Sequence, residues 1–212
     1  MASKVKPLKE KIAGDASKSE VTRQRIVDAA ARVFAQRGYA HTRLTDIAAE
    51  AKSHAGGIYY YFSSREQLVQ ELLKTSTKRT IDAINARLEA LPEGASTLDR
   101  LRAAVTAQIT EVVAHDSYSA AFLKIYSQVP EEIKIEHRPV LREFFEIWRR
   151  IIRQGQAAGE IRTDIDPAVM RLAIVGSIQW SAEWADQNTS SPEKLAEQMA
   201  ALFFGGLVNN AS

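Results

Sequence analysis

Apolar residues recur every three or four positions along almost the whole chain, and this spacing places them on one face of an α-helix. No stretch alternates apolar and polar residues as a strand would, and no internal repeat or low-complexity tract is present. Proline and glycine interrupt the helical pattern at intervals, for example at Pro92-Glu93-Gly94 and at Pro130. The pattern therefore predicts an all-α protein of about nine helices.

The first predicted helix follows a polar, lysine-rich segment, residues 1–18, which we expect to be disordered. The pattern Ser17-x-x-Glu20 is a capping box, so the helix should begin near Ser19 or Glu20. Gly38 suits the left-handed turn that closes many helices, and we expect this helix to end there.

Two shorter helices follow closely. Thr42 is the expected N-cap of a helix over residues 44–51, and Lys52-Ser53 separates it from a second helix over residues 54–60, with Ile58 as its buried anchor. Two short helices joined by a tight turn form a helix-turn-helix, whose second helix enters the DNA major groove. Residues 19–65 therefore predict a three-helix DNA-binding domain.

The order of residues from Gln24 to Leu72 resembles the tetracycline-repressor (TetR) family of bacterial transcription regulators. The matching positions are Ile26, Val27, Ala30, Val33, Phe34, Gly38, Tyr39, residues 42–51, residues 58–62, Glu66 and Leu68. The chain departs from the family at Lys52, where the turn usually has glycine, at Ser53, where valine usually packs inward, and at Tyr61, where histidine is common. A non-glycine residue in a left-handed turn costs on the order of 1–2 kcal/mol, so we expect a less regular turn.

The resemblance assigns DNA contacts by position. It predicts that His54, Ala55 and Gly57 contact base edges. The small residues Ala55, Gly56 and Gly57 would let the helix backbone approach the DNA closely. The resemblance gives phosphates or flanking bases to Arg43, Tyr59, Tyr60 and Arg65, with Thr42 beside them. At least one of the three tyrosines at 59–61 is expected to pack in the core instead.

The remainder, residues 66–212, predicts a helical ligand-binding and dimerisation domain. A capping box at Ser63-x-x-Glu66 should start a long helix that ends near Ala90, and another long helix is expected from about Pro139 to Ala158. Residues 169–178 are apolar nearly all round, which requires cover on both sides. Two recognition helices must meet successive major grooves ~34–36 Å apart, so we expect a homodimer. Its predicted interface residues are Trp180, Trp184, Met199, Leu202, Phe203 and Gly206.

Aromatic residues on these helices have two interpretations. In the resembling family such helices surround a cavity for a small-molecule effector, which predicts a site formed by Phe122, Tyr126, Phe144, Trp148 and Gln179. The alternative is an ordinary hydrophobic core. Polar residues among the apolar ones favour the cavity, since a ligand site needs a few polar groups in an apolar wall.

Composition and charge narrow the function further. The 212 residues are 45% hydrophobic and include no cysteine, which excludes disulfides and thiolate metal sites. Residues 1–65 hold 12 Lys and Arg against 6 Asp and Glu, whereas the remainder holds 16 against 20, so the positive charge coincides with the helix-turn-helix. We find no signal-peptide or membrane-spanning pattern, and we expect a cytoplasmic protein without a membrane partner.

Catalytic and metal-binding patterns are not evident. The four histidines lack ligand spacing, and no nucleophile, phosphate-loop or cofactor motif is present. We interpret Glu131, Glu132, Glu136 and His137 as a solvated charged turn, with a metal site or a helical enzyme as minor alternatives.

The leading hypothesis is a repressor that binds a palindromic operator as a homodimer and leaves it when an effector binds. The main alternative is an architectural DNA-binding protein with a filled core. Some resembling regulators respond to acyl-coenzyme A thioesters, while drugs, lipids and aromatic metabolites stay open as effectors.

Overall fold

The computed structural model describes residues 8–113, 117–184 and 191–207, and within these ranges the chain forms helices without strands apart from one isolated bridge residue at Ile161. No helix in this part of the chain is long and apolar enough to span a bilayer. The helices are α1 (Leu8–Arg37), α2 (Leu44–Glu50), α3 (Ala55–Tyr61), α4 (Arg65–Glu89), α5 (Thr97–Val113), α6 (Ser117–Tyr126), α7 (Glu131–Ala157), α8 (Pro167–Trp184) and α9 (Pro192–Leu207). The predicted all-α class is confirmed.

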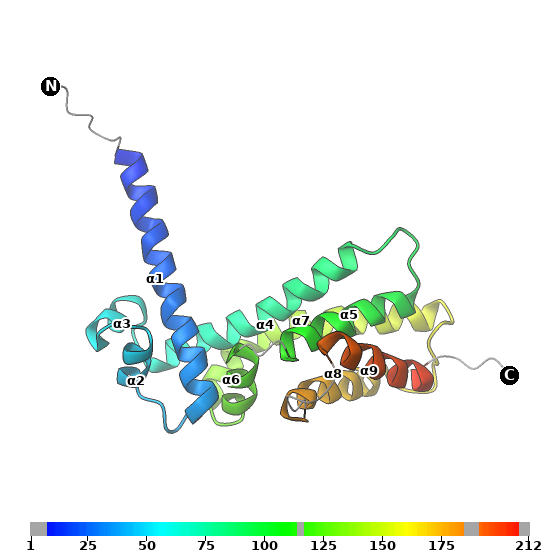
Figure 1. Ribbon diagram of the computed structural model, residues 1–212. Coiled ribbons are helices and arrows are strands. Elements are labelled where there is room, and N and C mark those ends of the chain that lie inside the picture. Colours follow the sequence, from blue (N-terminus) through cyan, green and yellow to red (C-terminus); the bar gives the residue numbers. More distant parts are fainter. Residues whose placement is uncertain (1–7, 114–116, 185–190, 208–212) are drawn as a thin grey trace.

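Two hydrophobic cores divide the molecule. The first joins α1, α2, α3 and the first half of α4 with α6, and it includes Phe34, Ile58 and Ile125. The second joins the far half of α4 with α5, α7, α8 and α9 around Trp148. Figure 1 shows α1 to α3 at one end of the molecule, with α6 between them and the α5, α8 and α9 group. The helix α6 therefore packs with α1 and the first half of α4, although it lies after α5 in the sequence.

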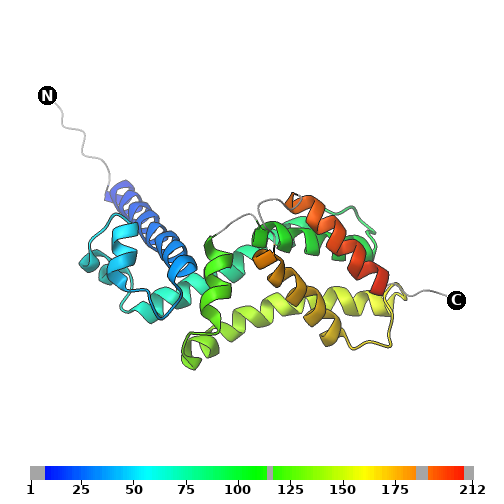
Figure 2. The same cartoon turned by 60° about the horizontal axis from the view of Figure 1, so that its bottom comes forward.

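Several helix ends follow the predicted signals. Gly38 closes α1 with φ +74°, and Gly159 follows α7 with the same φ. The Asp166 carboxylate accepts a hydrogen bond from the Ala168 amide at 2.6 Å, so Asp166 caps the start of α8. Figure 2 shows α8 and α9 at the far end of the molecule, where both pack on α5.

Three predicted helix starts are wrong. The first helix begins at Leu8, so the segment up to Lys18 is not disordered from Leu8 onward, and Ser17-x-x-Glu20 lies inside a helix; Lys, Glu and Ala in this segment are good helix formers. The long helix expected from Pro139 begins at Glu131 and carries Pro139 in its interior. The N-cap of α4 is Ser64, one residue after the predicted Ser63; its hydroxyl accepts from the Gln67 amide, and the Gln67 side-chain oxygen accepts from the Ser63 amide.

Candidate nucleic-acid interface and ligand cavity

The turn between α2 and α3 has regular left-handed geometry even though it lacks glycine. Lys52 adopts φ 50°, and the Ser53 amide donates to the Ala48 carbonyl at 2.9 Å. The expected irregularity is therefore wrong, because backbone hydrogen bonds hold Lys52 in a conformation that costs a side-chain-bearing residue on the order of 1–2 kcal/mol.

Packing of α3 leaves its polar side chains toward solvent. Ile58 is fully buried, whereas Tyr59 and Tyr60 are 57% and 80% exposed. Tyr61 is partly buried against the first core, which confirms that one of the three tyrosines packs inward. Tyr59 and Tyr60 are exposed, so their hydroxyl groups are available to donate hydrogen bonds to DNA phosphates.

Gly57 lies on α3 and packs closely against the side chain of Ser53 in the preceding turn. A Cβ atom at Gly57 would lie 2.7 Å from the Oγ atom of Ser53, which is too close for any real contact. The small residue thus lets the turn pack against α3, with Ser53 where the family has valine. His54 occupies the N-cap position of α3 and is exposed, and Ala55 is the first residue of the helix.

The side chain of Thr42, one of the predicted DNA contacts, is bonded within the protein, whereas that of the neighbouring Arg43 is exposed. Thr42 is 1% exposed, and its hydroxyl donates to the Gly38 carbonyl at 2.7 Å, so it is neither the N-cap nor an available contact. The N-cap of α2 is Arg43, whose amide donates to the Asp46 carboxylate at 2.9 Å and whose side chain is exposed. That hydrogen bond, aided by Arg37, lowers the pKa of Asp46.

Arg65 has a structural role that the sequence did not indicate. Its guanidinium donates to the Thr42 carbonyl at 3.1 Å and to the Tyr39 carbonyl at 3.3 Å, and it lies 4.1 Å from the centre of the Tyr39 ring. These contacts fix the loop between α1 and α2 to the start of α4, and the phosphate contact of Arg65 stays a prediction.

A cavity of about 330 Å³ lies between α4, α5, α6, α7 and α8. Its lining residues are Ser76, Thr77, Thr80, Gln108, Val112, Ser119, Phe122, Tyr126, Leu141, Phe144, Phe145, Arg171, Leu172, Val175, Gly176, Gln179 and Trp180. The structure therefore brings together four of the predicted effector residues, Phe122, Tyr126, Phe144 and Gln179. The prediction for Trp148 is wrong, because its side chain is fully buried in the second core and does not line the cavity.

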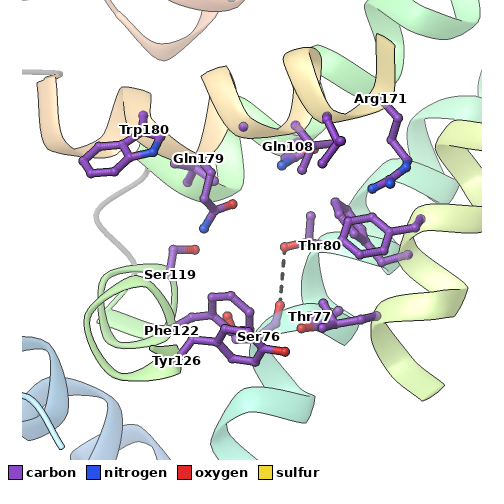
Figure 3. A pocket seen from close by; sticks show the side chains of 17 residues that line it. Ser76, Thr77, Thr80, Gln108, Ser119, Phe122, Tyr126, Arg171, Gln179 and Trp180 are labelled. Atoms are coloured by element: carbon purple, nitrogen blue, oxygen red, sulfur yellow. Dashed lines mark hydrogen bonds between the residues drawn. The ribbon is translucent and has the colours of Figure 1, made fainter. Parts of the chain in front are cut away.

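The walls of the cavity are mostly apolar, with polar groups at separate points. The rings of Phe122 and Tyr126 are stacked with 4.9 Å between their centres. Figure 3 shows the Gln179 side chain projecting from α8 into the cavity, on the side of Ser119 and Phe122. Gln179 lies eight positions after Arg171 on α8, which is about 12 Å along the helix at 1.5 Å per residue.

Arg171 supplies a positive charge at the other end of this wall. Its guanidinium lies 4.3 Å from the centre of the Phe145 ring. It forms no ion pair with any residue that the structure describes. The exposed lining residues Leu172 and Trp180 also belong to α8, so the cavity opens along this helix. Sequence reasoning missed Arg171, because α8 shows no amphipathic pattern that would mark one face as a binding wall.

His137 lies behind the cavity and not in a solvated turn. It is 4% exposed on α7, and its Nε2 atom is 3.1 Å from the Oγ1 atom of Thr77. Burial lowers the pKa of His137 to about 4, so the ring is neutral at pH 7. The structure corrects the predicted charged turn, since residues 131–137 form the first turns of α7. Among the described residues there is no group of three or more His, Asp or Glu side chains arranged to hold a metal ion.

The helix α6 connects the cavity to α1. Its Ser119, Phe122 and Tyr126 line the cavity, while the Tyr118 hydroxyl donates to the Asp28 carboxylate of α1 at 2.6 Å. Burial and the neighbouring Asp28 both raise the pKa of Tyr118, which keeps it protonated. The Lys124 ammonium also donates to the Gln36 carbonyl, at 2.8 Å. The helix α6 therefore joins the two parts of the chain in addition to α4.

The predicted dimer residues lie on α8 and α9. Trp180 and Leu202 are 65% and 77% exposed, whereas Met199 and Phe203 pack partly against the second core. Trp184 and Gly206 lie in these helices, but the burial of both residues is outside the described part of the structure. Trp180 also lines the cavity, so it belongs to two predicted surfaces.

Two family models match the chain. The model described as "Tetracyclin repressor-like, C-terminal domain" matches residues 94–207, and the one described as "Bacterial regulatory proteins, tetR family" matches residues 26–72. A relative named HTH-type transcriptional repressor KstR2, from Mycolicibacterium smegmatis, is 27% identical over 194 residues, which cover 89% of this chain and 91% of that protein.

Solved structures have the same fold. The crystal structure of AibR in complex with isovaleryl coenzyme A and operator DNA aligns with a TM-score of 0.77 at 22% identity and covers 86% of this chain and 98% of that one. The structure of FadR from Bacillus subtilis in complex with stearoyl-CoA aligns with a TM-score of 0.74 at 22% identity, with the same coverage of both chains.

Proposed function

The chain belongs to the tetracycline-repressor family of bacterial transcription regulators, and from this premise we propose that it represses transcription until a small amphipathic effector binds. In this proposal a homodimer binds a palindromic operator in the cytoplasm, and the effector releases it. The observation that carries the proposal is that α6 both lines the cavity and is hydrogen-bonded to α1.

DNA binding rests on α3 and its surroundings. The exposed Tyr59, Tyr60 and Arg43 would contact phosphates, which position the protein without selecting a sequence. His54, Ala55 and Gly57 at the start of α3 would face base edges. Because Ala55 and Gly57 have no side-chain donors, DNA shape would contribute to operator choice alongside His54.

The effector we propose is an acyl-coenzyme A thioester. The mostly apolar wall suits an acyl group, and Arg171 near the opening suits an anionic part of the same molecule, because a guanidinium binds phosphate well. Support also comes from the fold relatives AibR and FadR, whose structures hold isovaleryl coenzyme A and stearoyl-CoA.

Release would follow from a shift of α6. An acyl group beside Phe122 and Tyr126 would displace α6, and hydrogen bonds from Tyr118 and Lys124 would transmit the displacement to α1, which packs behind the helix-turn-helix. Two linked recognition helices would then no longer match successive major grooves. The effector must bind the DNA-incompetent form more tightly, since equal affinity for both forms shifts nothing.

The alternative of an architectural DNA-binding protein predicts a filled core, and a 330 Å³ cavity with polar groups in its wall argues against it. Selection of bound sequences from a random duplex library tests the proposal. We expect a palindrome with half-sites one helical turn apart, and we expect acyl-coenzyme A thioesters to weaken binding to it. Recovery of sequences without two-fold symmetry would contradict the operator model, and binding insensitive to every thioester would contradict the effector class.

A further inference from the structure

The side-chain oxygen of Gln108 is buried without a hydrogen-bond partner. Gln108 lies on α5, is 1% exposed, and its Oε1 atom is inaccessible and unbonded in the structure. The residue lines the cavity, where Figure 3 draws it close to α8. A buried carbonyl oxygen without a donor costs stability, so a cavity that retains one is suited to a ligand that supplies the donor.

Three other hydroxyl groups in the cavity wall are already engaged within the protein. The Thr77 hydroxyl is bonded to His137, and the Ser119 hydroxyl donates to the Glu111 carbonyl at 3.2 Å. The Thr80 hydroxyl donates to the Ser76 carbonyl at 3.3 Å, and Figure 3 shows this contact. Among the lining side chains that the structure describes, the Oε1 atom of Gln108 is the fully buried polar atom without a hydrogen-bond partner, and its bonding capacity is left for a ligand.

We propose that Gln108 binds a hydroxyl group on the acyl portion of the effector, so that the effector is a hydroxylated acyl thioester and not a saturated one. This inference rests on the proposed function. A keto or thioester carbonyl only accepts hydrogen bonds and cannot satisfy Oε1, whereas a hydroxyl donates to Oε1 and can accept from Nε2. The charged coenzyme A portion stays near the opening, since burying phosphates without compensation is costly, and the acyl group is the part that reaches Gln108.

The test is calorimetric titration of the full-length protein with decanoyl-coenzyme A and with its monohydroxylated derivatives, the hydroxyl placed at successive carbons. We expect one hydroxylated isomer to bind about tenfold more tightly than decanoyl-coenzyme A, which corresponds to about 1.4 kcal/mol. In Gln108→Met, which keeps the length of the side chain and removes its amide, this preference should disappear. Gln179→Met, which removes a partly exposed amide from the same cavity, is the matched control and should keep it.

Folding is checked by thermal melting. Gln108→Met should melt no lower than the wild type, because it replaces a buried unpaired amide with an apolar group of similar shape. Equal affinity of the wild type for all the thioesters would overturn the inference and leave the proposed function standing. If Gln108→Met still preferred the hydroxylated isomer over decanoyl-coenzyme A, the inference would also be overturned. An equal loss of affinity for every thioester in Gln108→Met would overturn it as well, because it would place the Gln108 amide against the coenzyme A portion. Failure of the wild type to bind any thioester would reject the effector class together with the inference.

Discussion

The Tyr118 hydroxyl lies 2.6 Å from the Oδ1 atom of Asp28, and this hydrogen bond joins α6 to α1 across the boundary between the two functional parts of the chain. The Gln24 amide donates to the same hydroxyl at 2.8 Å, so α1 contributes two partners. Tyr118 is 3% exposed and precedes the cavity-lining Ser119 by one residue. A displacement of the cavity wall at Ser119 therefore moves the adjacent Tyr118 and its hydrogen bond to α1.

We predict that Tyr118→Phe weakens the coupling between effector and operator. The substitution keeps the buried ring and removes the hydrogen bonds to α1, so each ligand alone should bind with nearly unchanged affinity. The factor by which effector lowers operator affinity should fall about fivefold, because loss of these bonds is on the order of 1 kcal/mol. Fluorescence anisotropy of labelled operator, with and without effector, measures this factor. Tyr126→Phe removes a hydroxyl on the same helix that is not bonded to α1, and a fall of the same size there would contradict the proposed route.

The sequence could predict the helix-turn-helix because its features are local. Ile58 and Gly38 lie within a few residues of the positions they stabilise, so spacing alone identifies them. Arg65 could not be assigned in this way, because its partners Tyr39 and Thr42 precede it by more than 20 residues and only the fold brings them together. Gln108 was missed for the same reason, since its place in the cavity depends on the packing of five helices.

The start of α7 lies eight positions before the predicted start at Pro139. The apolar pattern from Leu141 onward predicts a helix that starts at about Pro139. In the structure Pro139 lies in the interior of α7, and His137, two residues before it, is buried against Thr77. Tertiary packing of residues 131–137 outweighs the local cost of the proline.

Neutral, buried His137 should make stability depend on pH. Its pKa is about 4 in the folded protein and near the ordinary 6.5 when unfolded, so between these values the unfolded chain takes up a proton that the folded protein excludes. The contribution of neutral His137 to the free energy of unfolding is fully present above pH 6.5. It falls as the pH drops toward 4, by at most about 1.4 kcal/mol per pH unit. Urea unfolding across this range should show a shallower fall in His137→Gln, which has no titrating ring. An identical pH profile for both proteins would show that His137 is accessible to protons in the folded state.

Arg43 and Arg65 should give different results when each is replaced by alanine. Arg43 is exposed, so Arg43→Ala should weaken binding to all DNA sequences equally and reduce the slope of log affinity against log salt by about one. Arg65 is bonded to two carbonyls, so Arg65→Ala should lower the free energy of unfolding by about 1 to 2 kcal/mol. Salt titrations and urea unfolding of both variants separate the two roles. A stable Arg65→Ala protein with a reduced salt slope would return Arg65 to the phosphate contacts.

Leu202 provides the sharper test of the proposed dimer. Phe203 packs partly within its own chain, whereas Leu202 is 77% exposed, so Leu202→Glu should leave the protomer folded. At a dimer interface the new charge would be buried without a partner, which is strongly unfavourable. Sedimentation at micromolar concentration should show a dimer for the wild type and a monomer for the variant. Ile135→Glu places the same charge at an exposed apolar residue of α7 and should remain dimeric. A monomeric wild type would refute the assembly.

Filling the cavity should separate effector response from DNA binding. Gln179 projects into the cavity from α8, so Gln179→Trp would occupy space that the acyl group needs, while the helix-turn-helix is unchanged (Figure 3). A tenfold loss of operator affinity on effector binding requires ~1.4 kcal/mol of coupling, and by linkage operator must weaken effector tenfold as well. Both effects should vanish in Gln179→Trp and persist in Gln179→Ala, which leaves the cavity open. Release of Gln179→Trp from operator at ordinary effector concentrations would mean that the effector binds elsewhere.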